Sequence, residues 1–185
     1  MYPWFRFIRA QVGAVIQPRV GLFDTTRVRL RIWPQDLDLN FHTNNGRYLT
    51  LADIGRLHWF VRTGISDAAR RRRVYPVVGD AIARFRRDLK VFDAFDLDTR
   101  LLGWDERWGF IEHRFIRGGR VIGVVAVRGV FTGPQGVITP VSLLEVVGSG
   151  AQSPALPEWA TRFHQASDQL SGLLREEERA QGLRT

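Results

Sequence analysis

Strict alternation of apolar and polar residues first appears in residues 26–33, TRVRLRIW. Val28, Leu30 and Ile32 fall on one side and three arginines on the other, which predicts a strand with one buried face. Further apolar segments, separated by turn residues, predict more strands downstream. They cover residues 74–89 with a bend at Gly79, 97–104, 110–117 and 121–131. The last segment is apolar almost throughout, which favours a strand covered on both faces.

Helical periodicity appears in two segments. Apolar residues surround most of the circumference of the segment from Gly46 to about Thr63, so we expect a long helix that its neighbours cover on most sides. Asn44 is a favourable N-cap for it, and Gly64 favours a left-handed stop. Residues 158–180 predict a second amphipathic helix, docked on the sheet or on a neighbouring chain.

The first 19 residues mix aromatic residues with isolated arginines, and their apolar run is too short to span a bilayer. We expect a helix that packs on the body of the protein, with contact to a membrane surface as the alternative. The element order β-α-β-β-β-β with short connections predicts an antiparallel sheet packed on one long helix, an α+β fold. The predicted divisions are an N-terminal segment 1–25, a main domain 26–147, and a linker with a C-terminal helix 148–185.

The charged residues are 27 basic and 19 acidic, a net charge of +8 that comes almost entirely from arginine. Such a surface attracts nucleic acid, acidic lipid or phosphate-bearing ligands. A genome rich in arginine codons is the alternative explanation. No recognised nucleic-acid motif is present, so we expect no nucleic-acid partner. The densest cluster, Arg70 to Arg73, is predicted to lie in a solvated loop.

Cysteine is absent, which excludes disulfides and thiolate metal sites and favours a reducing, cytoplasmic location. The four histidines are scattered, so no metal centre is expected. The candidate chemistry lies in the loop before the long helix, which carries Asp36, Asp38, Asn40 and His42. Unpaired N–H groups and the dipole at a helix start favour negative charge nearby. A carboxylate beside such a pole is suited to attack on a carbonyl group.

This loop also carries a resemblance to a known family. The spacing of Asp36-Leu37-Asp38, His42, Asn44-Asn45 and Tyr48 resembles the hotdog-fold acyl-CoA thioesterases of the 4-hydroxybenzoyl-CoA thioesterase type. The Trp-Pro-x-Asp loop and the extra C-terminal helix make the chain similar to the thioesterase superfamily member 6 group. The resemblance implies a hotdog fold, in which an antiparallel sheet wraps around one long central helix, and it covers about residues 26–133.

The resemblance implies hydrolysis of an acyl-CoA to free acid and CoA, with CoA as part of the substrate and no separate cofactor. Asp38 would act as general base for water or as nucleophile, and the backbone N–H of Asn45 or Gly46 would polarise the thioester carbonyl. An Asp38 that merely caps the helix is the structural alternative. His42 is a further candidate catalytic residue that would hydrogen-bond the loop or the ligand, while Asp36 is expected to have a structural role.

Substrate-binding residues are also implied by the resemblance. Arg107 is the candidate for the CoA phosphates, with Arg84 and its neighbours Arg86 and Arg87 as alternatives. Tyr48 and Trp108 are expected to contribute to the substrate site. Proteins of this family pair two sheets edge to edge, so we expect a homodimer or a dimer of dimers.

Two rival functions remain open. An enoyl-CoA hydratase-like hotdog enzyme would show the pattern D-x-N-P-x-H, whereas three residues separate Asp38 from His42 here, without a proline. A non-catalytic protein could keep the fold and bind acyl thioesters without cleaving them.

Overall fold

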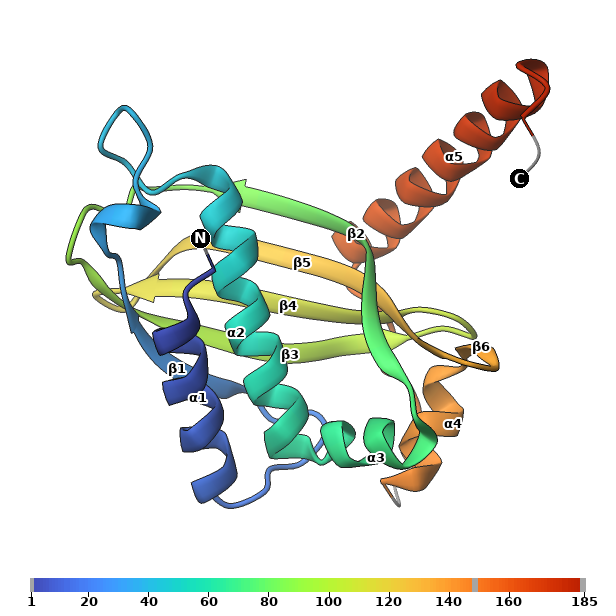
Figure 1. Ribbon diagram of the computed structural model, residues 1–185, viewed down its shortest axis with the longest axis horizontal. Helices are drawn as coiled ribbons and strands as arrows, with labels where there is room; N and C mark the ends of the chain where they lie inside the picture. Colours follow the sequence, from blue (N-terminus) through green and yellow to red (C-terminus); the bar gives the residue numbers. More distant parts are fainter. Residues whose placement is uncertain (1, 148–149, 184–185) are drawn as a thin grey trace.

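The computed structural model of the protein describes residues 2–147 and 150–183. Its elements follow one another as shown in Figure 1. They are α1 (Trp4–Ile16), β1 (Thr26–Arg31), the 3-10 turn η1 (Pro34–Asp36), α2 (Asn45–Thr63), α3 (Ile65–Arg72), β2 (Tyr75–Phe85), β3 (Ala94–Trp104), β4 (Gly109–Arg117), β5 (Arg120–Gly133), β6 (Gly136–Ile138), α4 (Pro140–Val146) and α5 (Glu158–Ala180).

The strands form one antiparallel sheet in the order β1-β3-β4-β5-β2, with β6 added to β5. The sheet curls around α2, which crosses its concave face (Figure 1). Gly118 and Gly119 form the β4–β5 turn with positive φ angles of 56° and 73°. The expected bend of β2 is confirmed, because its register with β5 shifts between Val78 and Asp80. The predicted α+β class is therefore correct.

Helix α2 is the centre of the core, as its apolar circumference predicts. Leu51, Ile54 and Trp59 are fully buried. The helix approaches the sheet closely at Gly55, where an added Cβ would lie 2.5 Å from the Thr99 hydroxyl oxygen. Both predicted helix ends are confirmed. The Asn44 side chain accepts the Gly46 N–H at 2.9 Å, and Gly64 adopts a left-handed φ of 85°.

The N-terminal helix packs on the body, as expected, and lies beside α2 (Figure 1). Its buried residues are Arg6, Ala10 and Ala14. The Arg6 guanidinium holds the Asp36 carboxylate through two bonds, of 2.5 and 2.7 Å, with Asp36 fully buried. This ion pair ties α1 to the loop that precedes α2.

Three expectations need correction. Arg70, Arg71 and Arg72 belong to helix α3, because Gly64 redirects the chain into a new helix whose Ile65, Ala68 and Ala69 are buried. The strand predicted to reach residue 89 ends at Phe85. Elements β6 and α4 were not predicted, since each is too short to show a periodic pattern. Helix α5 has the predicted bounds and projects from the sheet (Figure 1).

Two histidines are buried in the core, and they predict a pH-dependent stability. His58 on α2 is 2% exposed, and burial, with a smaller effect of Arg62, lowers its pKa from 6.5 to about 4. Burial likewise holds the pKa of His113 well below its usual value. The unfolded chain therefore binds protons that the folded chain does not, so stability is highest above pH 6.5 and falls as the pH decreases.

We expect the titration of His58 alone to lower the free energy of unfolding by about 3 kcal/mol as the pH falls from 6.5 to 4. Urea unfolding of the parent protein and of His58→Leu across this range measures the effect, and the variant should show the shallower slope. Equal slopes would contradict the assignment to His58.

Candidate active site

The loop between η1 and α2 is a short hairpin closed by the bridge between Leu37 and Thr43. Within it the Asp38 N–H donates to the His42 carbonyl at 2.8 Å. The Asp38 carboxylate then accepts two backbone N–H groups through Oδ1, from Asn40 at 2.8 Å and from His42 at 3.2 Å. These bonds fix the position of the half-buried Asp38 side chain.

Asp38 keeps one oxygen available for chemistry. In the described part of the chain, its Oδ2 has no hydrogen-bond donor, whereas Oδ1 is engaged by the loop. The hairpin leads directly into α2 through Asn44, whose own N–H donates to the Asp36 carbonyl at 2.8 Å. The hairpin that carries Asp38 and the electropositive start of α2 therefore lie at the same end of the molecule (Figure 1).

The two candidate N–H donors at the helix start are not equivalent. The Gly46 N–H is already bound to the Asn44 side chain. The Asn45 N–H has no acceptor among residues 2–147 and 150–183. Asn45 is thus the better placed of the two to bind a developing oxyanion.

Asp36 has the structural role expected of it, and its main partner is Arg6 of helix α1. Besides Arg6, it accepts the Trp33 N–H at 2.9 Å, and the Arg47 guanidinium lies 3.5 Å away. All of these contacts are buried or nearly so, and they leave the carboxylate enclosed. The two aspartates of the motif therefore differ: Asp36 holds the loop and Asp38 remains accessible.

His42 and Tyr48 flank this site in different ways. The His42 ring is half exposed and lies 3.7 Å from the Asp88 carboxylate, and only its backbone contacts Asp38. Tyr48 is 3% exposed, with its ring 4.9 Å from the rings of Phe85 and Phe115. Burial raises the Tyr48 pKa to about 12. Its ring is part of the core, and a contact with substrate stays a prediction.

Arg107 and Trp108 lie far from Asp38 within one chain. They belong to the β3–β4 turn, at the opposite end of the sheet from the start of α2 (Figure 1). The Arg107 guanidinium lies 5.0 Å from the centre of the Trp108 ring. Asp105 orders this turn by accepting the backbone N–H groups of both residues. The structure does not bring these two predicted residues to the Asp38 loop.

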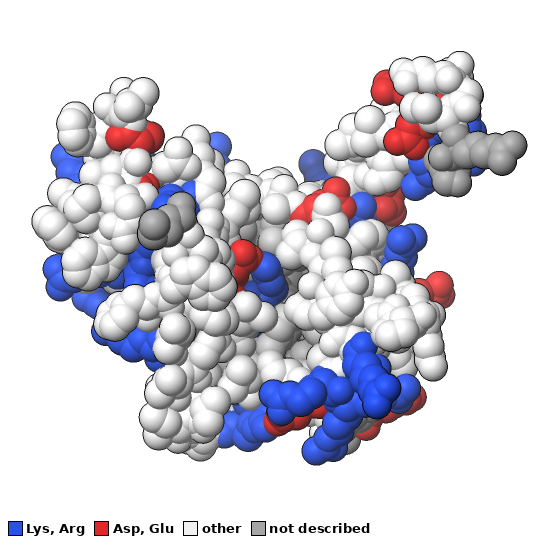
Figure 2. Space-filling view, viewed as in Figure 1, with Lys and Arg blue, Asp and Glu red and all other residues white. Residues whose placement is uncertain are grey.

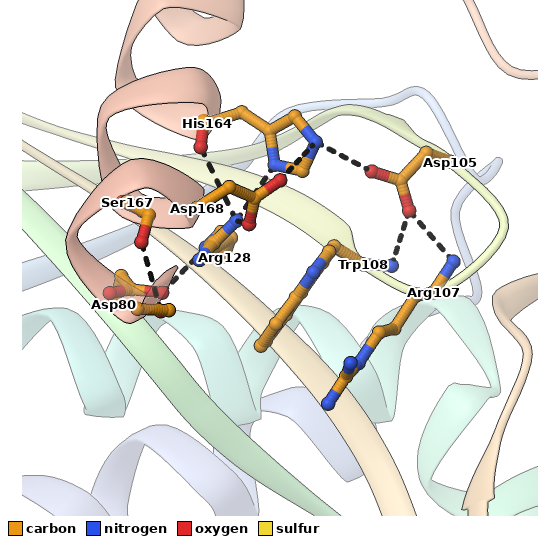
Figure 3. Close-up of polar contacts among 9 residues, drawn as sticks. Asp80, Asp105, Arg107, Trp108, Arg128, His164, Ser167 and Asp168 are labelled. Atoms are coloured by element: carbon orange, nitrogen blue, oxygen red, sulfur yellow. Dashed lines mark hydrogen bonds and ion pairs between the residues drawn. The ribbon is translucent and has the colours of Figure 1, made fainter. Parts of the chain in front are cut away.

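The Trp108 ring belongs to a cluster of contacts that holds α5 on the sheet (Figure 3). The sequence analysis did not predict this cluster. Arg128 of β5 is 1% exposed, lies 4.3 Å above the Trp108 ring and bonds Asp80 and Asp168, each at 2.5 Å. His164 of α5 also contacts Arg128, at 2.8 Å. A lone arginine within an apolar strand was the available signal, because a buried guanidinium requires carboxylate partners.

A cluster of arginines lies at the same end of the molecule as Asp38. These arginines line a groove, the arginine groove, whose residues are Arg86, Arg87, Asp88, Arg117, Gly118, Arg120 and Ile122. Asp88 connects it to the Asp38 loop through His42. Arg84 is exposed on the outer face of β2, in a shallow pocket with Trp159, and points away from this groove.

An apolar cavity lies beneath the other end of α2. It has a volume of about 70 Å³ and lies between strands β2 to β5 and helices α2, α3 and α4. Trp59, Phe60, Val77 and Leu143 are among its lining residues, and Arg56 is the one charged side chain there. Such a space suits an uncharged organic group. In the described residues, no cluster of three metal-ligating side chains occurs.

Comparison with protein families matches residues 32–163 to the thioesterase-like superfamily. The chain is 31% identical to Protein THEM6 of Drosophila melanogaster over 166 residues, which cover 85% of this chain and 83% of that protein. It is 33% identical to Protein THEM6 of Xenopus laevis over 150 residues, which cover 79% of this chain and 70% of that protein. Thioesterase poxG of Penicillium oxalicum is 27% identical over 115 residues, covering 55% of this chain and 38% of that protein.

Solved structures share this arrangement of sheet and helix. A gentisyl-coenzyme A thioesterase superposes with a TM-score of 0.57 at 19% identity, covering 67% of this chain and all of that one. A mutant 4-hydroxybenzoyl CoA thioesterase complexed with 4-hydroxybenzoyl CoA gives a TM-score of 0.58 at 15% identity, covering 66% and 98%. Both likenesses concern the fold.

Proposed function

The chain belongs to the thioesterase-like superfamily and has its hotdog fold, and from this premise we propose that it hydrolyses acyl-CoA with Asp38 as the essential carboxylate. Thioester hydrolysis is the activity for which several of its relatives and structural neighbours are named. The observation that carries the proposal is the free Oδ2 of Asp38 at the start of α2. Release of thiol from acyl-CoAs of graded length tests the activity.

The reaction needs a proton acceptor and an oxyanion site. As general base, Asp38 takes a proton from water, the hydroxide oxygen attacks the thioester carbon, and the carbonyl oxygen becomes an oxyanion held by the Asn45 N–H. Collapse of this intermediate breaks the C–S bond, and the CoA sulfur leaves as thiolate and is then protonated. As nucleophile, Asp38 instead forms a mixed anhydride that water cleaves. One preorganised donor such as Asn45 N–H contributes about 3 kcal/mol to the transition state.

The CoA phosphates are assigned to the arginine groove near Asp88. Arg117 is paired with Asp93 at 2.6 Å, and Arg86 donates to the Val121 carbonyl at 3.3 Å. In the described parts of the chain, the guanidinium groups of Arg87 and Arg120 have no acceptor. Two unpaired guanidinium groups can bind phosphate oxygens in the bidentate geometry that arginine favours.

The double variant Arg87→Ala/Arg120→Ala is therefore expected to raise the KM for acyl-CoA about tenfold, with little change in kcat. Steady-state kinetics with acyl-CoA and with an acyl-pantetheine that lacks the nucleotide provide the measurement, and only the former should respond. Arg107→Ala is the matched comparison. A rise in KM confined to Arg107→Ala would place the phosphates at the β3–β4 turn instead.

The protein is further proposed to be a homodimer joined along β2. This strand is 11 residues long and pairs only with β5 among the described strands. It leaves five large apolar side chains 39% to 60% exposed, at Tyr75, Val77, Val78, Ile82 and Phe85. A long apolar edge of this kind requires a partner.

A cytoplasmic location stays a prediction from the sequence.

Antiparallel pairing of two β2 strands would also complete the active site around Asp38. Phe85 lies beside Tyr48 near the start of α2, and in a symmetric pair it faces the beginning of the partner's β2. The beginning of β2, at Pro76 to Val78, lines the apolar cavity. The acyl chain of a substrate bound beside Asp38 of one protomer would thus point toward the apolar cavity of the other protomer. This arrangement favours an uncharged, apolar acyl group.

We expect Val78→Glu/Ile82→Glu to dissociate the dimer, because it places four like charges across the two-fold axis. Sedimentation at micromolar concentration measures the change from dimer to monomer, and acyl-CoA turnover should fall with it. Val141→Glu on α4, where the parent side chain is 50% exposed, is the control that should remain dimeric. A parent protein that sediments as a monomer would contradict the proposed pairing.

A further inference from the structure

Helix α1 presents an apolar surface to the outside of the molecule. Taking 100° per residue, its outward side chains form one stripe about 120° wide, the width of a typical buried helix face. The members of this apolar stripe are 52% to 77% exposed, and they are Trp4, Phe5, Ile8, Val12, Val15 and Ile16. A contiguous apolar surface of this kind on a folded protein indicates a binding surface.

The stripe is not required by the packing of α1. The inward face carries the buried Arg6, Ala10 and Ala14 and the partly buried Phe7, and the bond from Arg6 to Asp36 fixes the helix on the body. Polar residues on the outer face would leave these contacts unchanged. The helix therefore holds the stripe rigidly at the surface, where Figure 2 shows a largely white area over α1 in the same orientation as Figure 1.

Arginines border the apolar stripe along a groove between α1 and β1. The groove is lined by Phe5, Arg6, Arg9, Arg29, Leu30, Arg31, Trp33 and Ala94, without any acidic residue. Arg29 is paired with Asp96 at 2.9 Å. Arg9 and Arg31 donate only to backbone carbonyls, of Arg29 and Phe92, each at 3.0 Å, and within the described chain neither has a carboxylate partner. Their remaining N–H groups are available to an anion.

We propose that α1 docks on an anionic lipid bilayer, with the apolar stripe in the boundary between headgroups and acyl chains and Arg9 and Arg31 on lipid phosphates. An apolar face beside basic residues is the composition of interfacial helices, and tryptophan suits this depth. The net charge of +8 adds long-range attraction to such a surface. None of the described helices is long and apolar enough to cross a bilayer.

The position of α1 leaves this surface free in the proposed dimer. In the sheet order, β1 and β2 form opposite edges, and α1 lies on the β1 side (Figure 1). Pairing along β2 thus leaves the apolar stripe uncovered. The inference does not depend on thioester chemistry, because it rests on the exposed residues and their charges alone.

Co-sedimentation of the full chain with vesicles tests the proposal. We expect binding to phosphatidylcholine vesicles that contain phosphatidylglycerol, weaker binding to phosphatidylcholine alone, and loss of the difference at high salt. Ile8→Glu/Val12→Glu should weaken binding by at least about tenfold, since it removes two inserted side chains and adds charge. Arg9→Gln/Arg31→Gln should reduce only the part of the vesicle binding that depends on phosphatidylglycerol.

Leu170→Glu/Leu173→Glu on α5 is the matched control, because its side chains are similarly exposed at 55% and 50%, and it should bind like the parent. Val15→Gln/Ile16→Gln is a milder second variant of the stripe that should also weaken binding, with circular dichroism confirming the fold. Absence of vesicle binding, or equal binding by the stripe variants and the α5 control, would overturn the proposal. A change of oligomeric state in the stripe variants would instead assign the surface to a second copy of the chain.

Discussion

Asp38→Asn is expected to lower kcat for acyl-CoA hydrolysis by about 10²- to 10⁴-fold, the contribution typical of a positioned proton acceptor. Asparagine is nearly isosteric, and its carbonyl oxygen can still accept the Asn40 and His42 N–H groups that hold the loop. The fold should therefore remain intact, and the loss should appear in turnover. Steady-state kinetics with thiol detection, alongside an unfolding curve, separate the two effects.

A remote carboxylate provides the control. Glu158 on α5 has a side chain 80% exposed and lies outside both the Asp38 hairpin and the arginine groove, so Glu158→Gln should retain turnover near the parent value. Unchanged turnover in Asp38→Asn would remove this residue from the mechanism. A parent protein that binds acyl-CoA without cleaving it would favour the non-catalytic alternative. Accumulation of an acylated Asp38 would identify the nucleophilic route.

The main elements could be predicted from the sequence because their signals are local. The 19 residues of α2 carry a cap, an apolar circumference and a left-handed stop, and the structure has the same limits. The alternation in β1 and the glycine turn after β4 likewise depend only on neighbouring residues. The motif around Asp38 was found in the same way, because all its residues lie in one short stretch of the sequence, residues 36–48.

The missed features depend on contacts distant in sequence. Arg6 and Asp36 are 30 positions apart, and Arg128 and Asp168 are 40 apart. No periodicity marks such partners, and an isolated arginine on an apolar segment has the same appearance whether it is exposed or buried. The separation of Arg107 from Asp38 is a consequence of sheet geometry, since the β3–β4 turn and the start of α2 lie at opposite ends of the strands.

The buried pair between Arg6 and Asp36 predicts the largest effect on stability. Arg6→Ala would leave a fully buried carboxylate with the Trp33 N–H and a more distant Arg47 guanidinium at 3.5 Å. Removing one partner of a buried ion pair costs about 3–5 kcal/mol, because the remaining charge loses its compensation. We expect a loss of this size in the free energy of unfolding, measured by denaturant titration at neutral pH.

Two matched variants make this prediction specific. Arg27→Ala breaks the pair with Asp98, in which the arginine side chain is 59% exposed, and should change the free energy of unfolding far less than Arg6→Ala because solvent screens the charges. Arg6→Met/Asp36→Asn removes both charges while keeping an acceptor for the Trp33 N–H, so it should be more stable than Arg6→Met alone. If the double variant were instead the less stable, the loss would reflect packing of α1. An uncompensated charge at Asp36 would then not be its cause.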